Sequence, residues 1–172
     1  FDRKILAGFA ELRAPLVGPE NARPGMQRLE LSLAGRIEHY DDVGTTRNPK
    51  IGVVWSPVEA VNVRASYGTS FRAPSLPEVF QPQDGGPTFL AQGAASKLVF
   101  IRYGGNPDLQ PERATSWTAG VDYSSRSLPG LRLSATWFDT RFKGQIGTPV
   151  YENLTNVLGN PAYAPFVQPL DV

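Results

Sequence analysis

The sequence predicts an all-β protein in which an antiparallel up-and-down meander is built from about six strands. Apolar and polar residues alternate over several stretches of about ten residues, which is typical of a strand with two different faces. The 172 residues include 17 glycines and 16 prolines, and this content favours turns over long helices. No stretch shows apolar residues at helical spacing over three turns.

The clearest alternation occurs in residues 61–71. One face of this strand carries Val63 and Tyr67, whereas the other carries Arg64. The strand is expected to end before Pro74, because proline lacks an amide donor and forces its predecessor into an extended conformation. Alternation predicts five further strands, at Lys4–Leu12, Gln27–Tyr40, Lys50–Trp55, Ala114–Ser124 and Leu131–Lys143.

The connections between these strands differ in length. Turns are expected at Pro15–Met26, Asp41–Arg47, Ser56–Ala60 and Ser124–Gly130. The segment Pro74–Arg113 is much longer and is expected to be an irregular loop. Its one ordered feature is a helical turn that begins with a capping box of Ser75 and Glu78. The tail from Gly144 is also expected to be a loop.

Composition excludes several kinds of site. The chain has no cysteine, so disulfides and thiolate metal ligands are absent, and its net charge of +1 argues against a nucleic-acid partner. His39 lies near Glu38, Asp41 and Asp42 in the sequence, but alternation places His39 and Glu38 on opposite faces of a strand. With one histidine, no Ser-His-Asp triad can be assembled. We expect no enzyme, no cofactor and no metal site.

The two faces of the predicted strands suggest a membrane. The polar face carries small and charged residues in strand after strand, as in the water-filled interior of a barrel, and the aromatic residues gather near strand ends, as in the two interfacial girdles of a membrane barrel. Six residues are predicted to be membrane-interface aromatics: Trp55, Tyr67, Phe71, Trp117, Tyr123 and Trp137.

Loop lengths predict the orientation, because outer-membrane barrels have short periplasmic turns and long outer loops. The segments Ser56–Ala60 and Ser124–Gly130 are expected to be periplasmic, and Pro74–Arg113 extracellular. Even the smallest barrels use about eight strands, and an open edge in lipid leaves backbone groups without partners. The chain is therefore expected to be part of a larger barrel.

Two other readings of the pattern remain open. A soluble β-sandwich that binds a ligand or glycan through the loop Pro74–Arg113 also has alternating strands. That reading predicts a dry core between two packed sheets, whereas a barrel predicts one curved meander with an exposed apolar face. An ungated porin is the second alternative, and it requires that no plug domain is present.

Three phrases of the sequence resemble the TonB-dependent receptors of Gram-negative outer membranes. They are RIEHYDDVGTTRNPKIGVVWSP at 36–57, VRASYGTSFRAPSLPEVF at 63–80 and GGNPDLQPERATSWTAGVDY at 104–123. They stand in the family's order, and the likeness extends from about Gly8 to Gly147. Asp41-Asp42-Val43 departs from the family's turn, and Thr118 stands near a position where the family often has Glu.

The resemblance implies a fold, an activity and a set of partners. The whole receptor is expected to be a 22-stranded barrel filled by an N-terminal plug, and residues 1–172 to be an internal part of its wall, without the plug or the C-terminal strands. Such receptors import iron-siderophores, haem, cobalamin or glycans with energy from TonB. The implied partners are outer-membrane lipid, the plug, TonB through the plug, and a small-molecule or oligosaccharide ligand.

The motif residues are expected to be structural. They are Asn48, Pro49, Lys50, Phe71, Arg72, Ala73, Pro74, Asn106, Pro107, Leu109, Pro111 and Glu112. In this interpretation Asn106 and Asp108 cap local amides, Glu112 pairs with an arginine in the lumen, and Arg72 frames the mouth of the barrel. Contact of Arg72 with an anionic ligand is the alternative. The ligand-binding candidates are Arg72, Gln83, Asp84, Lys97, Arg102 and Tyr103.

Overall fold

The computed structural model describes residues 2–92, 94–128, 130–147 and 157–168. They fall into two compact units. Residues 2–73 and 110–145 form the sheet unit, and residues 74–109 and those from 146 onward form the loop unit. The expected tail loop lies partly outside the described residues, because residues 148–156 are not among them.

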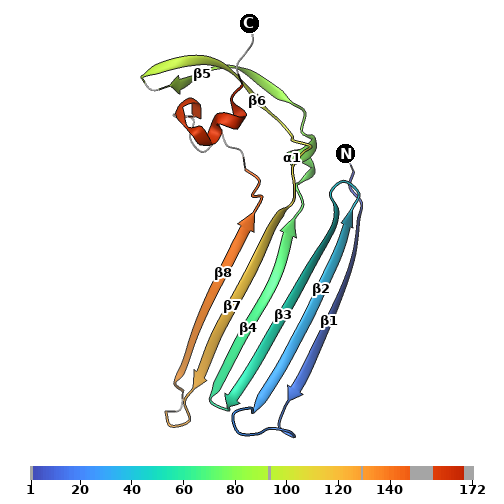
Figure 1. Ribbon diagram of the computed structural model, residues 1–172, viewed down its shortest axis with the longest axis vertical. Helices are drawn as coiled ribbons and strands as arrows, with labels where there is room; N and C mark the ends of the chain where they lie inside the picture. Colours follow the sequence, from blue (N-terminus) through green and yellow to red (C-terminus); the bar gives the residue numbers. More distant parts are fainter. Residues whose placement is uncertain (1, 93, 129, 148–156, 169–172) are drawn as a thin grey trace. The chain divides into compact units, whose positions relative to one another are not determined.

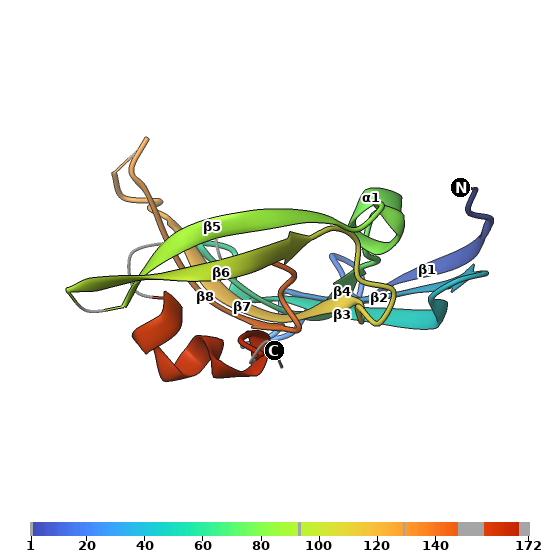
Figure 2. The ribbon, with the colours of Figure 1, turned by 90° about the horizontal axis from the view of Figure 1, so that it is seen from above.

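The sheet unit is one antiparallel sheet, in which each strand pairs with its neighbours in the meander (Figure 1). Its order is β1-β2-β3-β4-β7-β8, and seen from above the strands form one curved layer (Figure 2). The predicted all-β meander is therefore confirmed. The strands are β1 (Ile5–Val17), β2 (Arg28–Tyr40), β3 (Gly44–Val58), β4 (Val61–Arg72), β7 (Glu112–Ser124) and β8 (Arg132–Lys143).

Several strands are longer than alternation predicted. β1 continues beyond Leu12, with a register shift between Pro15 and Val17 that accommodates the proline in a strand paired on one side. β3 includes Thr45 and Thr46, which were assigned to a turn; their β-branched side chains suit a strand. The register is irregular between Trp55 and Val58, so the expected turn at Ser56–Ala60 is shorter, because β3 ends only at Val58.

Register places the apolar residues of different strands side by side. One row runs across five strands through direct partners, from Leu12 to Leu33, Ile51, Tyr67 and Trp117. The rings of Tyr67 and Trp117 lie 4.5 Å apart between centroids. A parallel row contains Leu29, Trp55, Val63, Val121 and Ala135. These rows define one face of the sheet, which we call the outward face.

Large apolar side chains of the outward face are exposed in the described part of the sheet unit. The exposed fractions are 59% for Leu12, 51% for Trp117 and 60% for Trp137. Among the described residues of the sheet unit, Val17 and Ala114 are the buried apolar side chains. A soluble sandwich is wrong for this sheet, because its apolar face is not packed against another sheet. Rows of apolar residues that are flanked by aromatic residues are typical of a barrel surface that contacts the hydrocarbon of a membrane.

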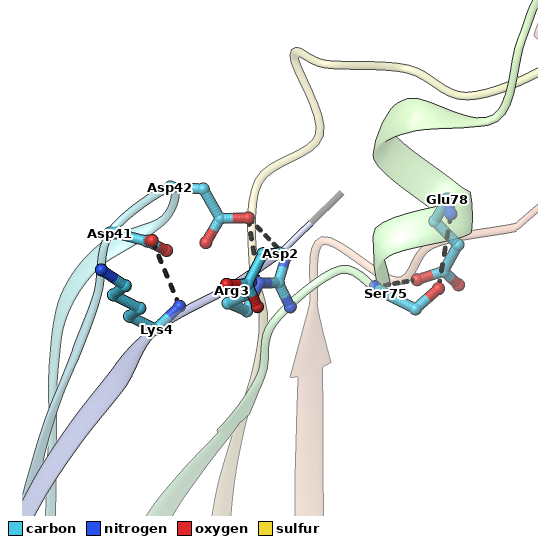
Figure 3. Close-up of polar contacts among 7 residues, drawn as sticks. All are labelled: Asp2, Arg3, Lys4, Asp41, Asp42, Ser75 and Glu78. Atoms are coloured by element: carbon cyan, nitrogen blue, oxygen red, sulfur yellow. Dashed lines mark hydrogen bonds and ion pairs between the residues drawn. The ribbon is translucent and has the colours of Figure 1, made fainter.

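The loop unit is more ordered than predicted. The helical turn is confirmed as α1 (Leu76–Phe80), and its capping box has Ser75 N donating to Glu78 Oε2 at 2.6 Å (Figure 3). The predicted irregular loop also contains an antiparallel hairpin, β5 (Asp84–Gln92) and β6 (Ala95–Tyr103). The short helices η1 (Val157–Gly159) and η2 (Pro161–Phe166) follow later in the chain. Within the described part of the chain, no helix is long and apolar enough to span a bilayer.

Val53 and Val54 provide a matched test of the two faces. Val53 pairs with Leu31 and Ala65 on the outward face, and Val54 pairs with Glu30 and Arg64 on the other. We expect Val53→Lys to destabilise the full-length protein by about 2–4 kcal/mol, because it places a charge in hydrocarbon. Val54→Lys is expected to cost much less, because it faces water.

Urea unfolding in lipid vesicles measures both variants. Equal losses of stability for Val53→Lys and Val54→Lys would show that the outward face does not contact lipid.

Candidate functional site

The face opposite the outward face is polar, and its arginines are paired with carboxylates. Glu30 accepts from Arg13 and from Arg28, the latter at 2.8 Å, and Arg36 donates to Glu38 at 2.7 Å. Both carboxylates are largely buried. Because each arginine shares its face with its partner, the pairs follow directly from register and alternation. We call this side the polar face.

A second hydrogen-bond network connects three strands, near the start of β4, the end of β7 and the start of β8. Arg64 on β4 donates to Asp122 on β7 and, at 2.6 Å, to Thr136 on β8. Ser134 also donates to Asp122, at 2.6 Å. Gly120 provides space for this network, because a Cβ there would come within 2.9 Å of the Arg64 Nε. A glycine on β7 is therefore required where the guanidinium crosses the strand.

The FRAPSL motif lies where β4 ends. Arg72 donates to Glu112 twice, at 2.7 Å and 3.1 Å, and the Glu112 side chain is 16% exposed. The two residues are direct partners in the β4–β7 register. The Phe71 ring packs edge-on against Tyr40, with 5.5 Å between centroids. The contacts of Arg72 and Glu112 thus tie the end of β4 to the start of β7.

The NPK motif lies at the end of the β3–β4 ladder. In this ladder, the pair farthest from the turn between β3 and β4 is Lys50 with Gly68. Pro49 precedes Lys50 on β3 and lies just beyond the ladder. Proline has no amide donor, which fits the end of a ladder. Asn48 and Lys50 also line a shallow depression of about 410 Å³ with Glu11 and other polar-face residues. The lining combines these polar groups with apolar side chains such as Phe9 and Phe71, so the depression can receive a protein segment of mixed character.

The acidic residues near His39 hold the start of β1 instead of forming a metal site. Arg3 donates to Asp42 at 2.6 Å, and the Lys4 amide donates to Asp41 at 3.1 Å (Figure 3). The His39 Nδ1 lies 2.9 Å from the Thr45 Oγ1. Among the described residues, no cluster of His, Cys, Asp or Glu has the composition to bind a metal ion.

Three of the ligand-binding candidates lie at the base of the hairpin. The Tyr103 hydroxyl donates to Asp84 at 3.1 Å, and these residues are direct partners in the register. Gln83 donates to the Gly105 carbonyl. Arg102 is next to Tyr103 but on the opposite face of the hairpin, and Lys97 lies near the other end of β6. Arg72 belongs to the sheet unit, so the structure does not assemble the six candidates into one site.

The NPDLQPE motif is held by local hydrogen bonds. Asn106 Oδ1 accepts from the Asp108 amide at 2.9 Å, and the Leu109 amide donates to the Asn106 carbonyl at 3.3 Å. The Asn106 amide in turn donates to the Glu78 carbonyl at the end of α1, at 2.8 Å. Pro107 lies within this turn and restricts its backbone. These contacts suit a structural role for the motif.

Sequence reasoning missed the apolar face of the hairpin. Phe89, Leu98 and Phe100 lie on one face with Arg102, and the three apolar side chains are 69%, 59% and 52% exposed. The available signal was the β-branched and aromatic run at residues 97–101. An unbroken apolar run does not alternate, and no Asn-Gly or Asp-Gly turn accompanies it, so the hairpin was not recognised.

Comparison with known proteins gives one consistent result. The family described as "TonB dependent receptor-like, beta-barrel" matches residues 1–164. The iron-regulated outer membrane virulence protein of Vibrio cholerae is 32% identical over 120 residues, which cover 70% of this chain and 16% of the relative. The heme/hemopexin utilization protein C of Haemophilus influenzae is 27% identical over 139 residues, which cover 74% of this chain and 18% of the relative.

A solved structure agrees with these sequence relatives. A mutant ferric enterobactin receptor from Pseudomonas aeruginosa, in complex with enterobactin, superposes with a TM-score of 0.62 and 25% identity. The match covers 82% of this chain and 18% of that structure. The chain thus spans about one-sixth of the length of the relatives that it matches.

The Arg72–Glu112 contact can be tested by a double-mutant cycle in the full-length protein. We expect Arg72→Ala and Glu112→Ala to show a coupling energy of about 0.5–1 kcal/mol, because the pair is partly exposed. Arg132→Ala with Glu112→Ala is the control, and its effects should add. Urea unfolding measures all variants. Additive effects of Arg72→Ala and Glu112→Ala would exclude an energetic role for the pair.

Proposed function

Because the chain belongs to the TonB-dependent receptor family, we propose that it forms part of the wall of an active transporter that imports iron-siderophore or haem complexes. The observation that carries this proposal is its 32% identity to an iron-regulated outer membrane protein over 70% of the chain. The likeness to a ferric enterobactin receptor and to a haem utilization protein supports the same substrate class. The outer membrane of a Gram-negative bacterium is its location.

The two faces of the sheet suit this role. The outward face presents uncovered apolar and aromatic side chains to lipid, and the polar face presents paired charges to a hydrated interior. Pairing keeps this part of the wall from acting as a strong trap for a charged solute, because Arg13, Arg28, Arg36 and Arg64 already contact carboxylates. The wall therefore guides and encloses the ligand, and transport energy must come from partners.

We propose that a plug domain and TonB are these partners. The polar depression near Asn48 and Lys50 offers the plug a hydrogen-bonding surface, and Glu11 and Lys50 provide charges of both signs there. A 22-stranded closed barrel and an extracellular position for residues 74–113 belong to the same proposal. An ungated porin has less support, because the matching relatives are receptors. Cobalamin and glycans have less support for the same reason, because the relatives' names refer to iron and haem.

Recognition of the ligand is assigned to the hairpin. Lys97 and Arg102 are exposed, and neither has a carboxylate partner among the described residues. Arg102 shares a face with Phe100 and Leu98, so charge and apolar surface are adjacent. This combination suits an anionic, aromatic iron chelate. Asp84, Tyr103 and Gln83 hold the hairpin base, and Arg72 frames the barrel mouth.

Growth on defined iron sources tests the proposed transport. Deletion of the full-length gene is expected to abolish growth of an iron-starved host on either a ferric siderophore or haem, and the intact gene on a plasmid should restore it. Uptake of ⁵⁵Fe-labelled siderophore and of haem identifies which substrate is carried. Unchanged uptake of both substrates after deletion would refute the proposed substrate class.

Variants of the hairpin test the recognition site. Lys97→Ala/Arg102→Ala is expected to weaken binding of ferric enterobactin to the purified full-length receptor by about tenfold, because a charge-assisted contact is lost whichever face of the hairpin the ligand meets. Arg23→Ala/Arg132→Ala is the matched control, since it removes the same charge elsewhere. Tryptophan fluorescence titration measures both. If the two double variants bind ferric enterobactin with equal affinity, Lys97 and Arg102 do not contribute to its recognition.

A further inference from the structure

The ladder between β3 and β4 stops short of the end at which β4 leads into residues 74–111. Its last register pair at that end is Lys50 with Gly68. Beyond this pair, in a part of the chain that the structure describes throughout, residues 44–49 of β3 are in register with β2 and residues 69–72 of β4 with β7, but not with each other. Figure 1 shows β3 and β4 diverging toward this end. We call the border between these two segments the seam.

The seam divides this end of the sheet into two blocks. Ladders join β1, β2 and β3 in one block, and β4, β7 and β8 in the other. The segment 74–111 leaves β4 and returns to β7, so both of its attachments belong to the second block. The ion pair of Arg72 with Glu112 also lies within that block. The strands that carry the long segment are therefore joined by a ladder to β8 but not to the neighbouring end of β3.

Side-chain contacts close the seam. The ring of Phe71, at the end of β4, packs edge-on against Tyr40, at the end of β2, with 5.5 Å between centroids. Thr46, in the β3 part of the seam, is 4% exposed. Its hydroxyl and that of Thr69, in the β4 part, are buried without a hydrogen-bond partner among the described residues. An unsatisfied buried hydroxyl is destabilising, so opening of the seam would let water bond to both. Regions with few backbone hydrogen bonds are also those that open locally most easily.

The seam begins just beyond a pair of aromatic residues on the outward face. Tyr67 and Trp117 are register partners, and Gly68, where the ladder to β3 ends, follows Tyr67 directly. Tyrosine and tryptophan favour the interface between hydrocarbon and water. Backbone groups without ladder partners are strongly disfavoured in hydrocarbon, and beyond an interfacial aromatic pair they meet water instead. The position of the seam is therefore compatible with its opening in a membrane.

We propose that the seam is a hinge in the wall, which opens and closes while the rest of the β3–β4 ladder stays intact. Opening separates Phe71 from Tyr40 and brings water to the hydroxyls of Thr46 and Thr69, and closing restores the ring contact. The ends of β4 and β7 that carry segment 74–111 thereby move relative to β3 without loss of ladder pairs. The opening is independent of what is transported, whereas its use in ligand uptake rests on the proposed function.

Thiol accessibility in the full-length receptor tests the opening, in a background without other cysteines; residues 1–172 contain none. Thr46→Cys and Ala114→Cys place thiols at positions that are 4% and 8% exposed, and Ala114 has ladder partners on both sides, Ser70 and Phe142. A rigid wall predicts that the less exposed Thr46 position reacts no faster than the Ala114 position. We expect a small, water-soluble methanethiosulfonate to modify Thr46→Cys about tenfold faster than Ala114→Cys, because the seam opens and the ladders around Ala114 do not. Equal rates, or faster modification of Ala114→Cys, would overturn the proposal.

A disulfide across the seam tests the use of the hinge in uptake. Asn48→Cys/Ser70→Cys joins two positions that would be register partners if the ladder continued, and both line the same depression. Oxidation with copper phenanthroline is expected to leave binding of ferric enterobactin unchanged and to slow uptake of ⁵⁵Fe about tenfold, relative to the same variant reduced with dithiothreitol. Val53→Cys/Ala65→Cys, which are partners within the ladder, is the matched control, and its uptake should be the same oxidised or reduced.

The two measurements separate failure of the hinge from failure of the transport proposal. Equal uptake by the oxidised and reduced forms of Asn48→Cys/Ser70→Cys would overturn the role of the seam in transport. If the unaltered receptor takes up neither ferric siderophore nor haem, the proposed function is wrong, and thiol accessibility still decides whether the seam opens. Retention of the electrophoretic shift on heating shows that each variant is folded.

Discussion

Hydrogen bonding between neighbouring strands is the constraint on which the rest of this structure depends. In hydrocarbon, water cannot satisfy a backbone amide or carbonyl, so each must bond to the next strand. The ladders of β2 with β3 and β7 with β8 meet that demand without a register shift. Such ladders fix the register, and the register decides which side chains share a face. A slip of one residue would turn the tryptophans toward water and the paired arginines of the polar face toward lipid.

Register explains why many charges of the polar face are paired. Arg64 and Asp122 lie on adjacent strands two residues out of line, as do Arg13 and Glu30, so their side chains share a face and meet without any special turn or loop. Pairing lowers the cost of placing charges on a crowded interior surface. It also fixes side-chain positions across strands. Gly120 belongs to the same arrangement, since its missing side chain lets the guanidinium of Arg64 cross β7.

The strands could be predicted from the sequence because alternation is a local signal, and the membrane could be inferred because aromatic residues recur on the apolar face. The strands extend beyond the expected ends, so Tyr67, Trp117 and Trp137 lie within them. Strand bounds were less predictable: Pro15 and Pro57 suggested turns, yet both lie within strands at register shifts. The hairpin β5–β6 was missed since its apolar run does not alternate. Arg72 was expected to be part of a frame, and its contact with Glu112 depends on two segments forty residues apart, which local patterns do not relate.

The sheet unit and the loop unit are expected to have different roles, because register and ion pairing restrict only the first. A wall whose strands are locked by register and by ion pairs is expected to tolerate few changes at its paired charges, because an altered charge leaves its partner unpaired. The hairpin has no such restriction: Lys97 and Arg102 are exposed, and Phe89 and Phe100 are uncovered on one face. Substitutions there cost little folding stability and alter the surface that a ligand meets. Selectivity is therefore expected to reside in the loop unit, while the sheet unit is expected to supply a fixed wall.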